Sequence, residues 1–318
     1  MSELLKYAEN GKVKLSNITR YIDRLNFPSV NLRTTLANIP EWKITLVSST
    51  YNGITFLGPC ITPTNGPAMN IRYFFCFFRK GGSSVLENKG QKTLLPNEGF
   101  TGQRLDIQEI LNESNGYLSE NGILTIGYGI QVEAILGKDG IWMFNFYDEL
   151  YDFEAKNDML TFHYKDSSGK TLHCFQHIFC FHTDRNMKTP LESDLISVSE
   201  DKIKYHNLEK CLQIAHGVRL QLTVVEYFEV IDVAWRFNFS NVIRYCEFKI
   251  IERTEKFNII DFRETVHFEM EHCLKRYLEY LDSVEMVADL LKDIEETMGM
   301  EQMSSETMKT FVDKFMSF

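Results

Sequence analysis

Apolar and polar side chains alternate along several stretches of the first 136 residues, as they do in β-strands with one buried face. The longest stretch is Leu124–Leu136, where an apolar or aromatic residue occupies every second position. Residues 42–46 alternate in the same way, and residues 71–78 form an aromatic run typical of a strand buried on both faces. Turn-forming residues such as Asn65-Gly66-Pro67 separate these stretches. The pattern predicts an antiparallel β-sandwich.

After residue 207 the apolar positions change to a helical period. Leu208, Cys211, Leu212 and Ala215 follow one another at steps of three or four residues, which places them on one face of a helix. His216-Gly217 comes directly after this stripe. Because glycine readily adopts the left-handed conformation found after helix ends, we expect the helix to end there.

Two further helices are predicted from their N-terminal signals. Thr223 and Glu226 have the spacing of a capping box, so a helix is expected to start at Thr223. Its apolar face is expected to contain Val225, Phe228, Ile231 and Trp235. Ser240 is a good N-cap for the next helix, whose residues Val242, Tyr245, Cys246 and Lys249 recur at helical spacing.

The regions on either side of these helices have their own patterns. Upstream, residues 159–164 and 171–174 flank a polar turn and predict a β-hairpin, which a helix at residues 175–182 follows. Downstream, residues 257–281, 282–299 and 304–318 predict amphipathic helices, with Asp282 and Glu285 as a capping pair. Residues 137–157 begin with a polar turn and continue as an aromatic-rich connection, which we expect to be helical.

Composition narrows the class of protein. The chain has 318 residues, of which 44% are hydrophobic, so two or three modules with real cores are expected. The net charge of −10 disfavours nucleic acid and anionic membranes as partners, because both require a basic face. The first residues have no apolar core of signal-peptide length, and no apolar run is long enough to span a bilayer. Seven cysteines, an odd number without a disulfide framework, fit reduced thiols, so we expect a soluble protein of the cytoplasm or nucleus.

No motif in the sequence predicts an active site. Ser168-Gly169-Lys170-Thr171 imitates the end of a P-loop, but Tyr164 stands where the first glycine belongs, and the context is strand-turn-strand. The only cluster with metal-ligating residue types consists of His173, Cys174, His177, Cys180 and His182. No second ligand pair follows it at the usual spacing, so ordinary core and edge residues are the favoured interpretation. We therefore predict no enzyme activity, cofactor or metal, and keep a zinc-dependent enzyme as an alternative.

The end of the predicted sandwich resembles a MATH (TRAF-like) domain. The resemblance rests on Asn97-Glu98-Gly99-Phe100, Leu105, Ile110-Leu111, and Asn115–Leu118 followed by the long strand. In this family a partner peptide adds along a groove of the sandwich, so the resemblance implies capture of a substrate peptide around Glu98, Gly99 and Phe100. Glu98 replaces the usual aromatic residue. Phe100 has two interpretations, a groove residue or a core residue.

The following region resembles a BTB (POZ) domain. The matching residues are Asp158 before the hairpin, His173 after its turn, His216-Gly217, and Arg244-Tyr245-Cys246-Glu247. The resemblance implies an α/β domain that forms homodimers, with Asp158 and His173 in the fold and dimer region. It also implies binding of cullin-3, for which Val198 and Glu200 of Val198-Ser199-Glu200 are the candidates. Residues 182–202 otherwise depart from the family pattern.

These observations predict an α+β multidomain protein. Its expected parts are a leader (residues 1–10), a MATH-like β-sandwich (11–136), a connection (137–157), a BTB/POZ-like domain (158–255) and a helical C-terminal extension (256–318). The function implied by the resemblance is that of a MATH–BTB adaptor, which holds a substrate peptide and recruits cullin-3 for substrate ubiquitination. The alternative is a protein-binding scaffold of the same fold without a ligase role.

Overall fold

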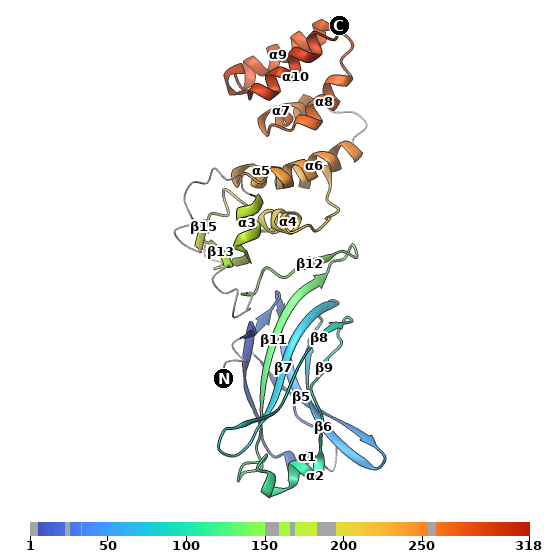
Figure 1. Cartoon of the computed structure of the whole chain (residues 1–318), viewed down its shortest axis with the longest axis vertical. Helices are drawn as coiled ribbons and strands as arrows, with labels where there is room; N and C mark the ends of the chain where they lie inside the picture. The colour runs from blue at the N-terminus through green and yellow to red at the C-terminus, as the bar shows by residue number, and fades with distance from the viewer. Residues whose placement is uncertain are drawn as a thin grey trace. The chain divides into compact units, whose positions relative to one another are not determined.

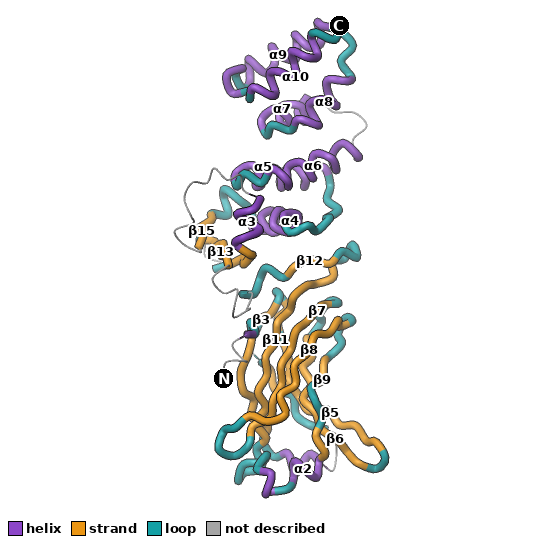
Figure 2. The backbone as a smooth tube through the Cα atoms, viewed as in Figure 1, coloured by secondary structure: helices purple, strands orange, loops and turns teal. Residues whose placement is uncertain are grey.

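The structure of the chain is a computed structural model. It describes residues 6–22, 26–32, 34–149, 159–165, 169–182, 195–253 and 259–318. Antiparallel sheets occupy the N-terminal part and helices the C-terminal part, as predicted (Figures 1 and 2). The chain divides into two units. The first comprises Met1–His163, Gly169–Phe175 and Asp194–Ile196, and the second comprises Tyr164–Ser168, Gln176–Ser193 and Ser197–Phe318.

Two antiparallel sheets form the first unit's main body. One has the strand order β1-β11-β7-β8, with β12 also paired to β11, and the other has the order β10-β6-β5-β2, with β9 also paired to β6. The strands of the first sheet are β1 (Glu9–Leu15), β7 (Met69–Phe78), β8 (Ser84–Leu94), β11 (Leu124–Leu136) and β12 (Trp142–Phe144). Those of the second are β2 (Val30–Asn31), β5 (Trp42–Tyr51), β6 (Ile54–Pro63), β9 (Phe100–Thr101) and β10 (Leu105–Asp106). Short elements complete the unit: β3 (Thr35–Leu36), β4 (Ile39–Pro40), α1 (Ile18–Ile22), α2 (Ile107–Leu111) and η2 (Glu113–Asn115).

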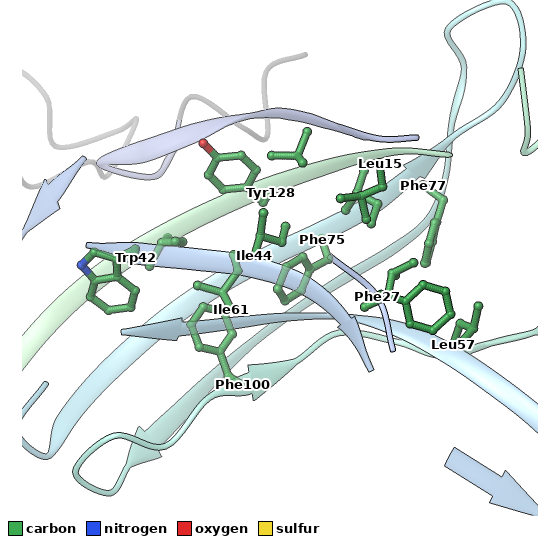
Figure 3. Packing of buried hydrophobic residues seen from close by; sticks show 14 of the residues in the cluster. Leu15, Phe27, Trp42, Ile44, Leu57, Ile61, Phe75, Phe77, Phe100 and Tyr128 are labelled. Carbon is green, nitrogen blue, oxygen red and sulfur yellow. The ribbon is translucent and has the colours of Figure 1, made fainter. Parts of the chain in front are cut away.

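One hydrophobic core joins the two sheets. Figure 3 shows Ile44 and Ile61 of the second sheet pointing toward Phe75 and Tyr128 of the first. The alternation read from the sequence therefore places the correct side chains inside, and β11 has the bounds predicted for it. Because the residues that face the other sheet are buried and apolar, burial of this face is the main stabilising contribution.

The N-terminal leader differs from the prediction. Tyr7 is buried, and Glu9 and Asn10 already belong to β1, which pairs with β11. Tyr7 covers the outer face of the sheet beside Phe74, in a place kept open by a glycine of β11: a Cβ added at Gly129 would lie 2.6 Å from the Tyr7 ring. The polar composition of residues 1–10 hid this strand, because its partners lie far away in the sequence.

The connection after β11 is not helical where it is described. Gly140 takes a left-handed φ of 77° in a turn, and β12 pairs back onto β11. Beyond β12, the buried Asn145 donates hydrogen bonds to Val132 O (2.8 Å) and to the Asp148 carboxylate (2.7 Å). Asp148 in turn accepts the N–H of Ala37 at 2.9 and 3.0 Å. This polar anchor and the β12 pairing satisfy the backbone without a helix.

The predicted hairpin is present. β13 (Met159–Tyr164) pairs antiparallel with β14 (Thr171–Phe175), and β15 (Leu195–Val198) completes a sheet of order β14-β13-β15. The helix predicted after the hairpin is α3 (Gln176–His182). The division between the two units passes through this small sheet rather than through residues 137–157, where the sequence analysis placed the boundary.

The central helices begin and end close to where their signals predict. α4 (Tyr205–Ala215) stops before Gly217, which has a φ of 86°. α5 (Val224–Arg236) starts with the complete Thr223/Glu226 capping box, whereas α6 (Ser240–Arg253) already includes the predicted N-cap Ser240 as its first residue, so it begins one residue earlier than predicted. The buried face of α5 was predicted only in part: it consists of Tyr227, Val230, Ile231, Val233 and Ala234, so Ile231 is buried as predicted, whereas Phe228 is half-buried and Val225 and Trp235 are exposed. Both stripes have helical spacing, and packing against α4 and α6 decides between them.

The C-terminal region contains α7 (Ile259–His267), α8 (Glu271–Glu279), α9 (Val284–Thr297), η4 (Met300–Gln302) and α10 (Ser305–Phe315). The single helix predicted over residues 257–281 is therefore wrong, because Glu269 breaks it with a left-handed φ of 55°. α9 is capped by Ser283, not by the predicted Asp282. Of the helices described, none combines the length and the apolar character needed to cross a bilayer.

Candidate functional site

The segment with the predicted peptide-binding residues forms one edge of the second sheet of the sandwich. β9 pairs with β6 through Ile61↔Phe100 and Cys60↔Thr101. In the described part of the chain, β9 pairs with no strand other than β6. One side of β9 is thus an edge, and unpaired strand edges are templates for an added strand.

The hydrogen-bond pattern shows which backbone groups face this edge. Gly102 donates its N–H to Pro59 O at 2.9 Å, so this pair is a hydrogen-bonded pair of the antiparallel ladder. Hydrogen-bonded and non-hydrogen-bonded pairs alternate, which makes Thr101 and Cys60 a non-hydrogen-bonded pair. The N–H and C=O of Thr101 therefore point away from β6, in the direction from which an extended peptide can approach.

Phe100 is a core residue. Its side chain is only 1% exposed, and its ring centroid lies 5.2 Å from that of Tyr73 and 5.7 Å from that of Phe75. Figure 3 shows the ring among the residues between the two sheets. Of the two interpretations that the sequence leaves open, the core one describes its position, and the ring is not available for stacking with a ligand.

Gly99 is required by packing. A Cβ at this position would lie 2.6 Å from Thr62 Oγ1 and 3.1 Å from Cys60 Sγ. Such distances are shorter than ordinary contacts, so any larger residue displaces β9 from β6. Gly99 thus allows the edge to lie close to its neighbour strand.

Glu98 holds the turn that leads into β9. Its carboxylate accepts the N–H of Leu95 at 2.9 Å and pairs with Lys92 Nζ of β8 at 2.6 Å. The Leu95 N–H and then the Lys92 ammonium lower the pKa of Glu98, which keeps the carboxylate ionised. Glu98 is therefore an exposed, charged residue that fixes the approach to the edge.

Four residues near this edge were missed by the sequence analysis. Tyr73 is half-buried against Phe100, while Lys92 and Arg104 lie close enough to Cys60 to lower the pKa of its thiol. Burial has the larger, opposite effect, and the pKa of Cys60 is raised. A protonated, buried thiol is a poor nucleophile, so no nucleophilic chemistry is expected from Cys60. Only the strand pairing brings them together, so no local sequence signal could have found them.

Of the two residues expected in the BTB-like fold and dimer region, the structure describes His173. His173, on β14, is 7% exposed; its N–H donates to Phe146 O at 2.7 Å, and its Nδ1 lies 3.1 Å from Thr161 Oγ1. Burial lowers the pKa of His173, so the neutral ring is favoured. Asp158 lies outside the described residues.

The pair expected to bind cullin-3 is engaged inside the second unit. Val198 is 5% exposed, and its carbonyl accepts the N–H of Lys165 at 3.1 Å. The Glu200 carboxylate accepts the N–H of Tyr205, the first residue of α4, at 3.1 and 3.2 Å. Both residues thus have roles in the fold.

The geometry of the described residues does not support the alternative of a zinc-dependent enzyme. Cys174 is buried, whereas His177 and Cys180 are exposed. Across the residues that the structure describes, no three His, Cys, Asp or Glu side chains lie close enough to share a metal ion. The Gly169-Lys170-Thr171 stretch leads into β14, as expected for a hairpin and not for a P-loop.

Comparison of the chain with models of protein families gives no match, and comparison with curated proteins gives no significant match.

Proposed function

We propose that the chain is a protein-interaction adaptor in which the sandwich captures an extended peptide at the outer edge of β9. The observation that carries this proposal is the orientation of the Thr101 backbone away from β6. An added strand gains main-chain hydrogen bonds from such an edge, and side chains next to it supply specificity. Tyr73, Lys92 and Arg104 are the candidates for that second role.

Proline at residue 101 provides the sharpest test of this edge. Thr101→Pro removes the N–H that faces outward and leaves the hydrogen bonds of Phe100 and Gly102 to β6 in place. The control is Thr101→Val, which has no hydroxyl but keeps the N–H. A phage-displayed library of random twelve-residue peptides serves as the probe, with isothermal titration calorimetry of the selected peptides.

We expect peptides that bind the parent chain and Thr101→Val about equally and bind Thr101→Pro roughly three- to tenfold more weakly, the loss expected for one main-chain hydrogen bond. Circular dichroism must show that Thr101→Pro stays folded. Selection of no peptide, or equal binding by folded Thr101→Pro, contradicts capture at this edge.

The second half of the proposal is that the BTB-like region forms homodimers and recruits cullin-3. It rests on the resemblance carried by the β13–β14 hairpin, His216-Gly217 and Cys246-Glu247. Two peptide sites in one dimer raise apparent affinity by ~100-fold or more when the substrate offers two epitopes.

A scaffold without a ligase role is the second candidate, and one observation favours it. Val198 is buried and Glu200 holds the first turn of α4, so neither side chain is presented for cullin-3 as the resemblance implies. Under this candidate the β9 edge binds peptides and cullin-3 does not bind. The two candidates therefore differ in the assemblies that they require: the adaptor needs a dimer and a complex with cullin-3, and the scaffold needs neither.

A further inference from the structure

A cavity of about 410 Å³ lies within the second unit, between α5, α6 and the turn that joins α7 to α8. The side chains that matter here are Trp235, Arg244, Glu247, Phe268, Glu269 and Glu271. Three carboxylates thus face one guanidinium group and two aromatic rings. The outer edge of β9, where we propose that a peptide binds, contains none of these residues.

Glu247 is the buried carboxylate of this cavity. It is 4% exposed, and its Oε1 accepts the N–H of His272 at 2.9 Å and that of Cys273 at 3.4 Å. Its other oxygen, Oε2, accepts no hydrogen bond from any residue in the described part of the chain. Oε2 is not one of the buried polar atoms without a partner, so it is open to the cavity, where water or the donor group of a ligand can reach it.

Two further carboxylates stand at the rim. Glu269 and Glu271 are exposed, and within the described residues neither forms an ion pair. Glu269 occupies a left-handed backbone position with a φ of 55°, where glycine is the favoured residue. Arg244 is the cavity's one positive side chain, and because it is exposed, water screens its charge more than that of Glu247.

An aromatic surface lies beside these carboxylates. Trp235 is 44% exposed although it is one of the largest apolar side chains of α5. Its ring centroid lies 5.3 Å from that of His267 and 6.3 Å from that of Phe268, which holds the indole in place. Cations bind favourably over such rings, and tryptophan binds them best.

We propose that this cavity binds an arginine side chain of a partner polypeptide. A guanidinium group is planar, so it can stack on Trp235 while its N–H groups reach Glu247 Oε2 and the rim carboxylates. A lysine ammonium is a compact, strongly hydrated charge that gains less from a flat ring. The proposal is independent of peptide capture by the sandwich, because it concerns other residues in the other unit.

The test uses calorimetry on the full chain with the peptide Gly-Ser-Gly-Arg-Gly-Ser-Gly. The matched probe carries citrulline, which has nearly the same shape and no charge. We expect the citrulline peptide to bind roughly tenfold more weakly or not at all, since the charge-assisted hydrogen bonds are lost. Equal binding of the two peptides overturns the proposal, as does equal binding of free arginine amide, which makes the ligand a small molecule.

Variants of the cavity residues test whether the arginine peptide binds in this cavity. Glu269→Gly removes a rim carboxylate and relieves the left-handed backbone, so it should fold at least as well and bind about two- to fivefold more weakly. Trp235→Leu should weaken binding by a similar factor, about two- to fivefold. Glu296→Gln, on the exposed side of α9, is the control for net charge and should bind like the parent. If Glu269→Gly and Trp235→Leu also bind like the parent, the arginine peptide is not in this cavity.

The pH dependence of the affinity for the arginine peptide distinguishes the contribution of Glu247 from that of the neighbouring groups. Burial raises the pKa of Glu247 to about 7, Glu271 adds to the rise, and Arg244 opposes it. The other titratable groups around it are Glu269, His272 and the thiols of Cys246 and Cys273. An ionised carboxylate is the better partner, so affinity should rise up to about tenfold between pH 6 and pH 8. Glu247→Gln should lose this rise; an equal rise in the variant assigns it to His272 and overturns the role of Glu247.

Discussion

At the scale of single residues, two carboxylates cap helices from a distance. The residues directly before α4 and α8, Lys204 and Met270, make no side-chain cap. Glu200 reaches the first N–H of α4, and Glu247 of α6 reaches two N–H groups at the start of α8. Since the first N–H groups of a helix have no partner within it, each carboxylate supplies an acceptor that the local sequence lacks.

The buried position of Glu247 makes stability depend on pH. Its pKa is about 7 in the folded chain and about 4.3 when unfolded, so the folded state binds the proton more tightly. The contribution is fully present below the unfolded pKa and is lost as pH rises through 7. We expect the free energy of unfolding of the second unit to fall by about 2–3 kcal/mol between pH 4.5 and pH 8 from this group.

Urea unfolding of the parent chain and of Glu247→Gln at several pH values measures this contribution. The glutamine can still accept the His272 N–H but does not titrate, so the variant's stability should depend less on pH and should exceed that of the parent above pH 7. Parallel pH profiles for the two proteins would refute the raised pKa. Glu252→Gln, an exposed change on the same helix, should leave the profile unchanged.

Phe100 gives a second prediction at this scale. Phe100→Ala should lower the free energy of unfolding of the sandwich by about 3–5 kcal/mol, the usual cost of removing a buried phenylalanine ring. Leu95→Ala, five residues earlier and 67% exposed, should cost less than about 0.5 kcal/mol. Chemical unfolding followed by circular dichroism measures both. A small effect of Phe100→Ala together with weaker peptide binding would favour a groove residue.

At the scale of elements, the sequence predicts those helices and strands whose signals lie close together along the chain. The alternation of β11, the Thr223/Glu226 capping box and the pairing of β13 with β14 are each encoded by residues close together in the sequence, and the structure contains all three. Strand β1 was missed because its partner, β11, is more than one hundred residues away. Neighbouring helices also decide which face of α5 is covered, so Val225 and Trp235 were wrongly expected on the buried face, whereas Ile231 was placed there correctly.

The same distinction between local signals and long-range pairing applies to the candidate site. The residues predicted to bind a peptide have structural contacts of different kinds: Glu98 fixes a turn, Gly99 permits close packing and Phe100 fills the core. The group that we propose for peptide binding is the backbone of Thr101, which no side-chain pattern reveals. Long-range pairing of β9 with β6 creates that edge. Strand register, and not a sequence motif, identifies the backbone groups of β9 that face away from β6.

At the scale of the whole molecule, the two candidate functions differ in assembly. An adaptor needs a dimer and a cullin-3 surface, whereas a scaffold needs neither. The chain has a mass of 37.1 kDa, so light scattering distinguishes a monomer from a dimer directly. We expect a dimer of twice this mass, which shifts to a heavier complex when the N-terminal domain of cullin-3 is added.

A variant of Glu200 tests whether cullin-3 binds through the carboxylate of this residue. Glu200→Gln keeps an acceptor for the Tyr205 N–H and removes the charge, so α4 should remain folded. If cullin-3 binds through this carboxylate, the variant stays dimeric and loses the heavier complex. If the heavier complex persists, cullin-3 binds elsewhere on the second unit. A parent chain that is monomeric and does not bind cullin-3 would mean that residues 182–202 lack both surfaces, which leaves the peptide-binding scaffold as the function.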